Sequence, residues 1–116
     1  MGIESINAQI KKHVLKCLPY EGFMQTDIKG LYVYRTDTAK RCEKCFYAPK
    51  IILMVQGCKK AIMGTSETVY RKNQCLVSGI EVPGTSYVVE ADAKNPLLTV
   101  SLALDTNFIS QMLAEM

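Results

Sequence analysis

Cys42 and Cys45 form a Cys-x-x-Cys pair, a spacing that can hold a metal or carry out thiol–disulfide exchange. Basic residues lie next to both cysteines in the sequence and would favour the thiolate form. A structural zinc site needs four ligands, but the remaining cysteines are isolated and His13 is the one histidine. A thioredoxin-like site needs a strand–turn–helix context, which the surrounding residues do not predict. Ordinary thiols are the favoured interpretation, with a redox switch and a metal site as the alternatives.

Other reactive side chains give no catalytic pattern. Cys58 follows a Gln-Gly turn, where a small filler residue is the favoured interpretation over a reactive thiol. His13 has no carboxylate or nucleophile near it in sequence, which favours a surface histidine over a base. The chain has no glycine-rich phosphate loop and no serine in a nucleophile-elbow context. We therefore expect no catalytic residue, no metal ligand and no cofactor.

Three tyrosines and a glutamine are the candidates for contact with a ligand. Tyr32 and Tyr34 lie two residues apart, hence on one face of a strand, and tyrosine combines apolar area with a hydroxyl. Gln56 ends the most apolar strand, and Tyr70 lies near the end of a later one. Because strand ends lie near the openings of a small barrel, we predict that Tyr34, Gln56 and Tyr70 converge at one mouth and contact the ligand, with Tyr32 as the less favoured fourth candidate. The alternative is core or interface packing, and a slip in register would turn them outward.

The elements that must position these residues are mostly strands. The apolar run from Ile51 to Val55 is short and rich in β-branched residues, which favours a buried strand. Leu98, Val100 and Leu102 alternate with smaller or polar residues, as in a strand with one strongly apolar face. The short spacing between strands is typical of a sandwich or barrel. The predicted strands cover residues 31–35, 51–56, 60–64, 67–71, 74–78, 85–91 and 97–104; residues 22–30 are turn-rich, and residues 36–48 are a loop or sheet edge.

Helices are expected at the two ends of the chain. In residues 1–18, Ile6, Ile10 and Val14 recur at helical spacing and the pattern ends before Pro19. In residues 105–116, a helix can be capped by a side chain at its start and has an apolar stripe that includes Ile109 and Leu113. Both stripes could serve contacts with a second copy or another domain.

The composition limits the class of protein. A chain of 116 residues with 48% hydrophobic residues is one globular domain, residues 1–116. The formal net charge of +3 is too small to indicate a nucleic-acid footprint. No apolar run reaches the length of a membrane helix, and no signal peptide is recognisable. The odd number of cysteines, five, favours reduced thiols and a cytoplasmic location.

An ordered set of short blocks from Tyr20 to Met116 resembles the N-terminal, cupin-like regulatory domain of AraC-type transcription regulators. No single block is specific, but their order is. Two departures matter: metal-dependent cupins carry paired histidines and a glutamate on their strands, which this chain lacks, and no segment here can supply the family's C-terminal helix-turn-helix domain. The blocks are Thr26, Ile28–Leu31, Tyr47–Pro49, Gln56–Lys59, Tyr70, Cys75–Val77, Glu81–Pro83, Glu90–Ala91, Asn95–Leu97 and Leu102–Asp105.

The resemblance implies an all-β, cupin-like barrel or double-stranded β-sandwich with flanking N- and C-terminal helices. It also implies a small-molecule effector in the barrel, a homodimer, and DNA contact only through the missing C-terminal domain, with no membrane partner. The expected function is effector sensing, dimerisation or both, without enzymatic activity. The alternatives are a small cupin enzyme of the isomerase or oxygenase type, and a dimerisation module whose barrel is packed shut. The effector, and whether the regulator activates or represses, do not follow from the residues.

Overall fold

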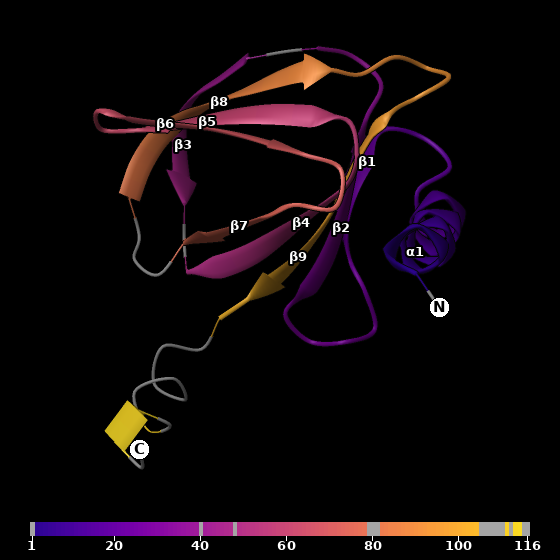
Figure 1. The fold of residues 1–116 in the computed structure, drawn as a ribbon, viewed down its shortest axis with the longest axis horizontal. Helices are drawn as coiled ribbons and strands as arrows, with labels where there is room; N and C mark the ends of the chain where they lie inside the picture. Colours follow the sequence, from indigo (N-terminus) through magenta and orange to yellow (C-terminus); the bar gives the residue numbers. More distant parts are fainter. Residues whose placement is uncertain are drawn as a thin grey trace.

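The computed structural model describes residues 2–39, 41–47, 49–78, 82–104, 111, 113 and 114, with the backbone alone at residues 41–47, 78, 82 and 83. Its described strands form two antiparallel sheets that face each other, with a helix beside them (Figure 1). The elements are α1 (Ile3–Cys17), β1 (Gly22–Gln25), β2 (Leu31–Thr36), β3 (Arg41–Tyr47), β4 (Lys50–Gln56), β5 (Cys58–Met63), β6 (Ser66–Arg71), β7 (Cys75–Ser78), β8 (Val82–Glu90) and β9 (Leu97–Ala103).

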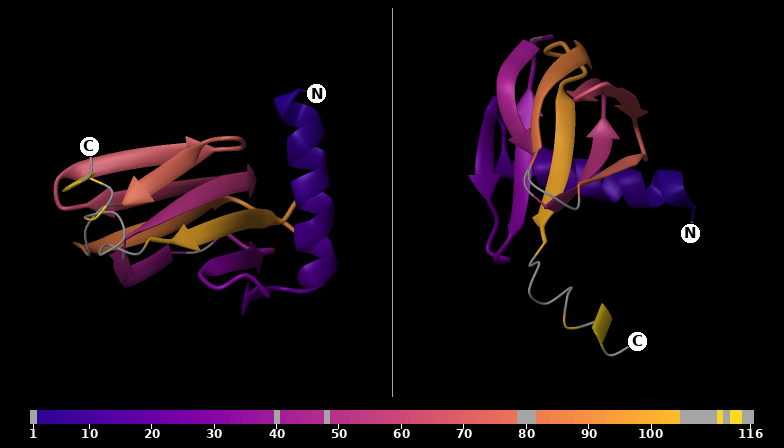
Figure 2. Two further views of the ribbon diagram at one scale, coloured as in Figure 1. Left: turned by 90° about the horizontal axis from the view of Figure 1, so that it is seen from below. Right: turned by 90° about the vertical axis from the view of Figure 1, so that its left-hand side faces the viewer.

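The two sheets have different strand orders. Sheet A has the order β1-β2-β9-β4-β7, and sheet B has the order β3-β8-β5-β6. The expected all-β, cupin-like sandwich is confirmed, as is the helix near the N-terminus. Most successive strands lie in different sheets, so the chain crosses repeatedly from one sheet to the other. Figure 2 shows the resulting two layers, with α1 lying crosswise to the strands.

Alternation along the strands gives sheet A two different faces. On its inner face, Tyr34 and Met54 flank Thr99 in neighbouring strands. On its outer face, Val33 and Leu53 flank Val100 in the same way. Each residue of the first triplet is next in sequence to a residue of the second. Adjacent residues of a strand point to opposite faces, so the first triplet faces sheet B and the second faces α1.

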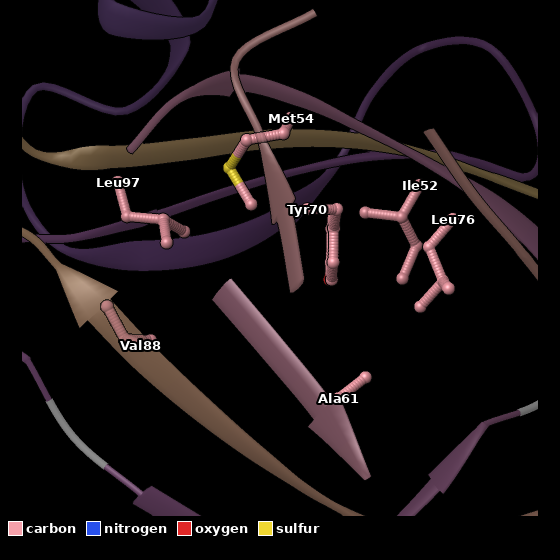
Figure 3. Close-up of a cluster of buried hydrophobic side chains, with 7 residues drawn as sticks. All are labelled: Ile52, Met54, Ala61, Tyr70, Leu76, Val88 and Leu97. Carbon is pink, nitrogen blue, oxygen red and sulfur yellow. The ribbon is translucent and has the colours of Figure 1, made fainter. Parts of the chain in front are cut away.

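The inner faces meet in one apolar core. Met54, Ala61 and Leu97 are completely buried there, and Tyr70 is 2% exposed. Figure 3 shows the seven side chains of this cluster, which come from the six strands β4 to β9: Ile52, Met54, Ala61, Tyr70, Leu76, Val88 and Leu97.

A second apolar cluster joins α1 to the outer face of sheet A. Val14 and Leu18 pack with Val33, Val55 and Leu98, all of which are buried. The later part of the apolar stripe predicted on residues 1–18 is therefore used inside the molecule. At the start of the helix, however, the side chains of Ile3 and Ile6 stay exposed.

One segment differs from the sequence predictions, and a second one confirms the sheet-edge alternative. Residues 22–30 were predicted as turn-rich, yet Gly22–Gln25 is β1, paired in register with β2. Residues 36–48 were predicted as a loop or sheet edge, and their second half is the edge strand β3, whose pairing with β8 shifts between Cys42 and Cys45. Polar, charged sequences suit an edge, because edge strands are protected from further pairing by charge and bulges.

The predicted helix over residues 105–116 lies largely outside the described residues. Among the helices that are described, none has the length and apolar character needed to cross a membrane.

Candidate ligand-binding cavity

A cavity of about 180 Å³ lies between the two sheets. Its lining combines two lysines, hydroxyl groups and apolar or aromatic surface. The described lining residues are Phe23 of β1, Tyr34 of β2, Lys50 and Ile52 of β4, Lys59 of β5, and Thr99 and Ser101 of β9.

The strand registers explain why these side chains meet. Tyr34 pairs with Thr99, and Ile52 pairs with Ser101, so their side chains share the inner face of sheet A. Across the gap, Lys59 lies level with Tyr70 and Val88, which are both in the inner core. The cavity therefore continues the core at the point where polar residues replace apolar ones.

The two lysines give the cavity its electrostatic character. The ammonium nitrogen of Lys59 lies 5.6 Å from the centre of the Tyr34 ring, within the range of a cation–π interaction. Burial lowers the pKa of Lys50 below its ordinary value, because removal of water disfavours the charged form. A lysine that faces inward from each sheet is unusual for a sandwich core, where charged groups are rare.

Tyr34 and Tyr32 lie together at this cavity. Tyr34 lines it and packs against the inner core. The Tyr32 ring stacks on Phe23, with 5.2 Å between ring centres and an angle of 14° between the planes. Phe23 also lines the cavity, so Tyr32 buttresses one of its walls. The face shared by the two tyrosines is the inner face of sheet A.

Tyr70 and Gln56 lie elsewhere. Tyr70 is buried in the core, between Met54 and Ile52 in Figure 3. Gln56 lines a separate hollow with Gly57 and residues 89–92, and its side-chain amide Nε2 donates to the carbonyl of Pro96 at 2.9 Å. The expected convergence of Tyr34, Gln56 and Tyr70 at one mouth is therefore wrong, while their contact with a ligand stays a prediction.

A bulge explains the position of Gln56. If β4 alternated regularly, Gln56 would face inward as Ile52 and Met54 do. Its pairing with β9 instead shifts between Met54 and Gln56, so that Gln56 is level with Leu98 of the outer cluster. A bulge adds a residue to one strand and re-aims the side chains that follow it, which period-two reasoning does not foresee.

Of the lining residues that the structure describes, sequence reasoning predicted Tyr34 and missed the other six, namely Phe23, Lys50, Ile52, Lys59, Thr99 and Ser101. It recognised the alternation in β9 but not the direction of each face. The strongly apolar face, with Leu98 and Val100, packs under α1, and the face with Thr99 and Ser101 points into the sandwich. The signal was present in the amphipathic N-terminal helix, because such a helix needs an apolar sheet face to cover.

The three cysteines whose side chains the structure describes are free thiols. Cys58 is 1% exposed, which suits a small filler side chain, and Cys17 and Cys75 are free and exposed. The side chains of Cys42 and Cys45 lie outside the described residues. His13 is exposed on α1. Within the described parts of the chain, no three His, Cys, Asp or Glu side chains gather as a metal site would require.

The fold agrees with comparisons to solved structures. A Neisseria meningitidis protein is similar with a TM-score of 0.61 at 14% identity, over 83% of this chain and 95% of that chain. A cupin superfamily protein from Desulfitobacterium hafniense gives 0.56 at 11% identity, over 72% and 75% of the two chains. Drosophila melanogaster CENP-C, solved bound to CAL1, gives 0.54 at 10% identity, over 85% and 96%. At these identities the likeness shows the cupin-like fold alone.

The sequence comparison identifies the family. Residues 27–116 match the family described as the AraC-type transcriptional regulator N-terminus. No curated protein matches the sequence. Because the match covers most of the chain, the protein belongs to this family of N-terminal regulatory domains.

Proposed function

We propose that this chain is the effector-sensing domain of an AraC-type transcription regulator, and that it also contributes to dimerisation. Such a domain would act on DNA only through a C-terminal helix-turn-helix domain, in the cytoplasm, and would carry out no catalysis. The observation that supports sensing is the cavity between the sheets, which has apolar walls and a few polar groups, as small-molecule sites do. A dimerisation module with a fully packed sandwich would lack it.

The route from cavity to output runs through sheet A. The residues that line the cavity alternate with those that hold α1: Tyr34 follows Val33, and Thr99 follows Leu98. A ligand that shifts β2 or β9 would therefore also shift the surface on which α1 packs. For the ligand to change the regulator's state, it must bind one of the two arrangements more tightly than the other.

A thermal-shift screen of small metabolites tests this proposal. A ligand that binds only the folded state raises the free energy of unfolding, by about 2.7 kcal/mol at a concentration one hundred times Kd, and so raises the melting temperature. The variant Ser101→Leu fills the cavity, and Ser66→Leu makes the same substitution at an exposed position on β6. We expect the shift to vanish in Ser101→Leu and persist in Ser66→Leu. A shift that survives Ser101→Leu unchanged would place the ligand elsewhere and contradict sensing through this cavity.

A further inference from the structure

We propose that the cavity between the sheets binds a small neutral aromatic molecule that carries one hydroxyl or carbonyl group. This inference rests on the proposed sensing function and deepens it by naming the chemical class of the effector. Two features of the lining support it: an aromatic ring that stays largely exposed, and a pair of hydroxyl groups without a hydrogen-bond partner in the part of the chain that the structure describes.

The exposed ring is that of Phe23 on β1. It lines the cavity and is 65% exposed, although the Tyr32 ring stacks against it. Phe23 lies level with Tyr34 of β2, whose ring lines the same cavity. Apolar surface in contact with water is unfavourable, and a second aromatic ring can cover it in a stacked or edge-to-face arrangement that contributes more than the buried area alone. The two rings therefore form a surface that suits a planar ligand.

The hydroxyl groups belong to Thr99 and Ser101 of β9. These residues stand two positions apart, so both side chains face the cavity from a central strand of sheet A. Thr99 is only 5% exposed, and neither hydroxyl makes a hydrogen bond within the described residues. A buried hydroxyl without a partner costs free energy, and it can both donate and accept a hydrogen bond. A ligand with a hydroxyl or carbonyl group gains affinity because it supplies that partner.

The charged groups of the lining already interact with the protein. The ammonium nitrogen of Lys59 lies over the Tyr34 ring, and Lys50 also has an interaction partner within the protein. The groups that remain for a ligand are thus uncharged hydroxyls and apolar surface. A charged ligand would lose its hydration on entering the cavity, a cost that a neutral ligand avoids. The lining therefore favours a neutral molecule.

The size of the cavity limits the ligand to a single ring. Its volume of about 180 Å³ is close to that of cavities, roughly 150 Å³, that hold one benzene molecule. Ile52 adds an apolar wall beside the two aromatic rings. Benzyl alcohol, which has one ring and one hydroxyl, is therefore a suitable probe.

The test compares benzyl alcohol with three molecules of similar size. Toluene keeps the ring and lacks the hydroxyl, cyclohexylmethanol keeps the hydroxyl and lacks the aromatic ring, and benzoate adds a charge. Binding to the purified chain is followed by the NMR shifts of the Thr99 and Ser101 backbone amides during titration at millimolar concentrations. We expect benzyl alcohol to bind roughly three- to tenfold more tightly than toluene or cyclohexylmethanol, and more tightly than benzoate.

Two variants separate the hydroxyl from the ring. Thr99→Val removes a hydroxyl and keeps the shape of the side chain, so it should weaken benzyl alcohol roughly three- to tenfold without weakening toluene. Phe23→Leu removes the ring and should weaken both probes by similar factors. The matched controls are Thr68→Val and Tyr20→Leu, at exposed positions outside the described lining of the cavity. Both should leave the two affinities unchanged.

The outcomes distinguish the chemical class from the sensing function. Equal affinities for benzyl alcohol and cyclohexylmethanol would overturn the aromatic ring, and equal losses of benzyl alcohol and toluene in Thr99→Val would overturn the role of the hydroxyl. Tighter binding of benzoate than of benzyl alcohol would overturn neutrality. If no probe moves the cavity signals, the whole inference fails. The metabolite screen decides sensing separately, because a metabolite of another class whose thermal shift vanishes in Ser101→Leu would still uphold it.

Discussion

Gly57 connects β4 to β5 in a conformation that other residues resist. Its φ is +99°, and a Cβ there would lie 3.0 Å from the carbonyl oxygen of Glu90 and 3.1 Å from the Cα of Leu97. We predict that Gly57→Ala lowers the free energy of unfolding by roughly 1–3 kcal/mol, through backbone strain and this contact with backbone atoms. Denaturant unfolding measures the loss.

Gly64 provides the matched control for Gly57. Its φ is also positive, at +62°, but a Cβ there meets nothing within 4 Å. Gly64→Ala should therefore cost only the conformational strain, and less than Gly57→Ala. Equal losses at the two positions would show that the close approach to Glu90 and Leu97 does not contribute.

At the scale of elements, Asn7 fixes α1 to the sandwich. This residue is 5% exposed, and its side-chain Nδ2 donates to the carbonyl of Val55 at 3.0 Å and to Oδ1 of Asn73 at 2.7 Å. We predict that Asn7→Ala lowers the free energy of unfolding by about 1–3 kcal/mol, because buried acceptors lose their donor. The exposed Gln9, on the same helix, should tolerate Gln9→Ala in the same unfolding experiment with little change, and an equal effect there would contradict the anchoring role.

A second contact makes the docking of α1 depend on pH. Glu4 accepts hydrogen bonds from Lys72, at 2.8 Å, and from Asn73, and the bond from Lys72 is the main cause that lowers the pKa of Glu4 below 4.5. A lowered folded-state pKa means that the stabilisation is present above about pH 4.5 and is lost as the pH falls through the folded pKa. Glu4→Gln should therefore flatten the stability profile in this acidic range. Identical profiles for the wild type and the variant would contradict the prediction.

The sequence predicted the elements better than the directions of their faces. Local patterns were sufficient for α1 and for most strands, because periodicity depends on neighbouring residues. The inner and outer faces of β9 depend on what covers each, and the position of Gln56 depends on a bulge in β4. Both are set by partners distant in sequence. For the same reason Tyr34 was found as a cavity residue, whereas Lys59, from the opposite sheet, was not.

For the whole molecule, the apolar start of α1 predicts self-association. The side chain of Ile3 is 62% exposed and that of Ile6 is 45% exposed, while Val14 further along is buried against sheet A. On α1, the apolar surface available for contact with a second copy is therefore limited to the first turns of the helix. Burial of each isoleucine contributes roughly 1.5–3 kcal/mol, enough for a few such contacts to support a dimer.

Analytical ultracentrifugation at micromolar concentrations tests the association. We expect a dimer for the wild type and a shift toward monomer for Ile6→Lys, because a charge would have to be buried in the contact. Gln9→Lys introduces the same charge at an already polar position and should leave the dimer intact. A wild-type monomer at the highest concentration reached would contradict self-association of this chain.

The position of β9 in sheet A has a consequence for how the protein is made. Among the strands that the structure describes, β9 comes last in the sequence, yet it lies between β2 and β4 at the centre of its sheet. During synthesis at roughly 5–20 residues per second, the earlier strands emerge from the ribosome seconds before the strand that joins them. Until the whole of β9, through Ala103, has left the ribosome, β2 lacks its neighbour in sheet A. Helix α1 then lacks part of the sheet face on which it packs. Sheet A is therefore completed only after β9 has been translated, and a chain interrupted before β9 leaves the pairs β1-β2 and β4-β7 as two unjoined sheet fragments with exposed edges.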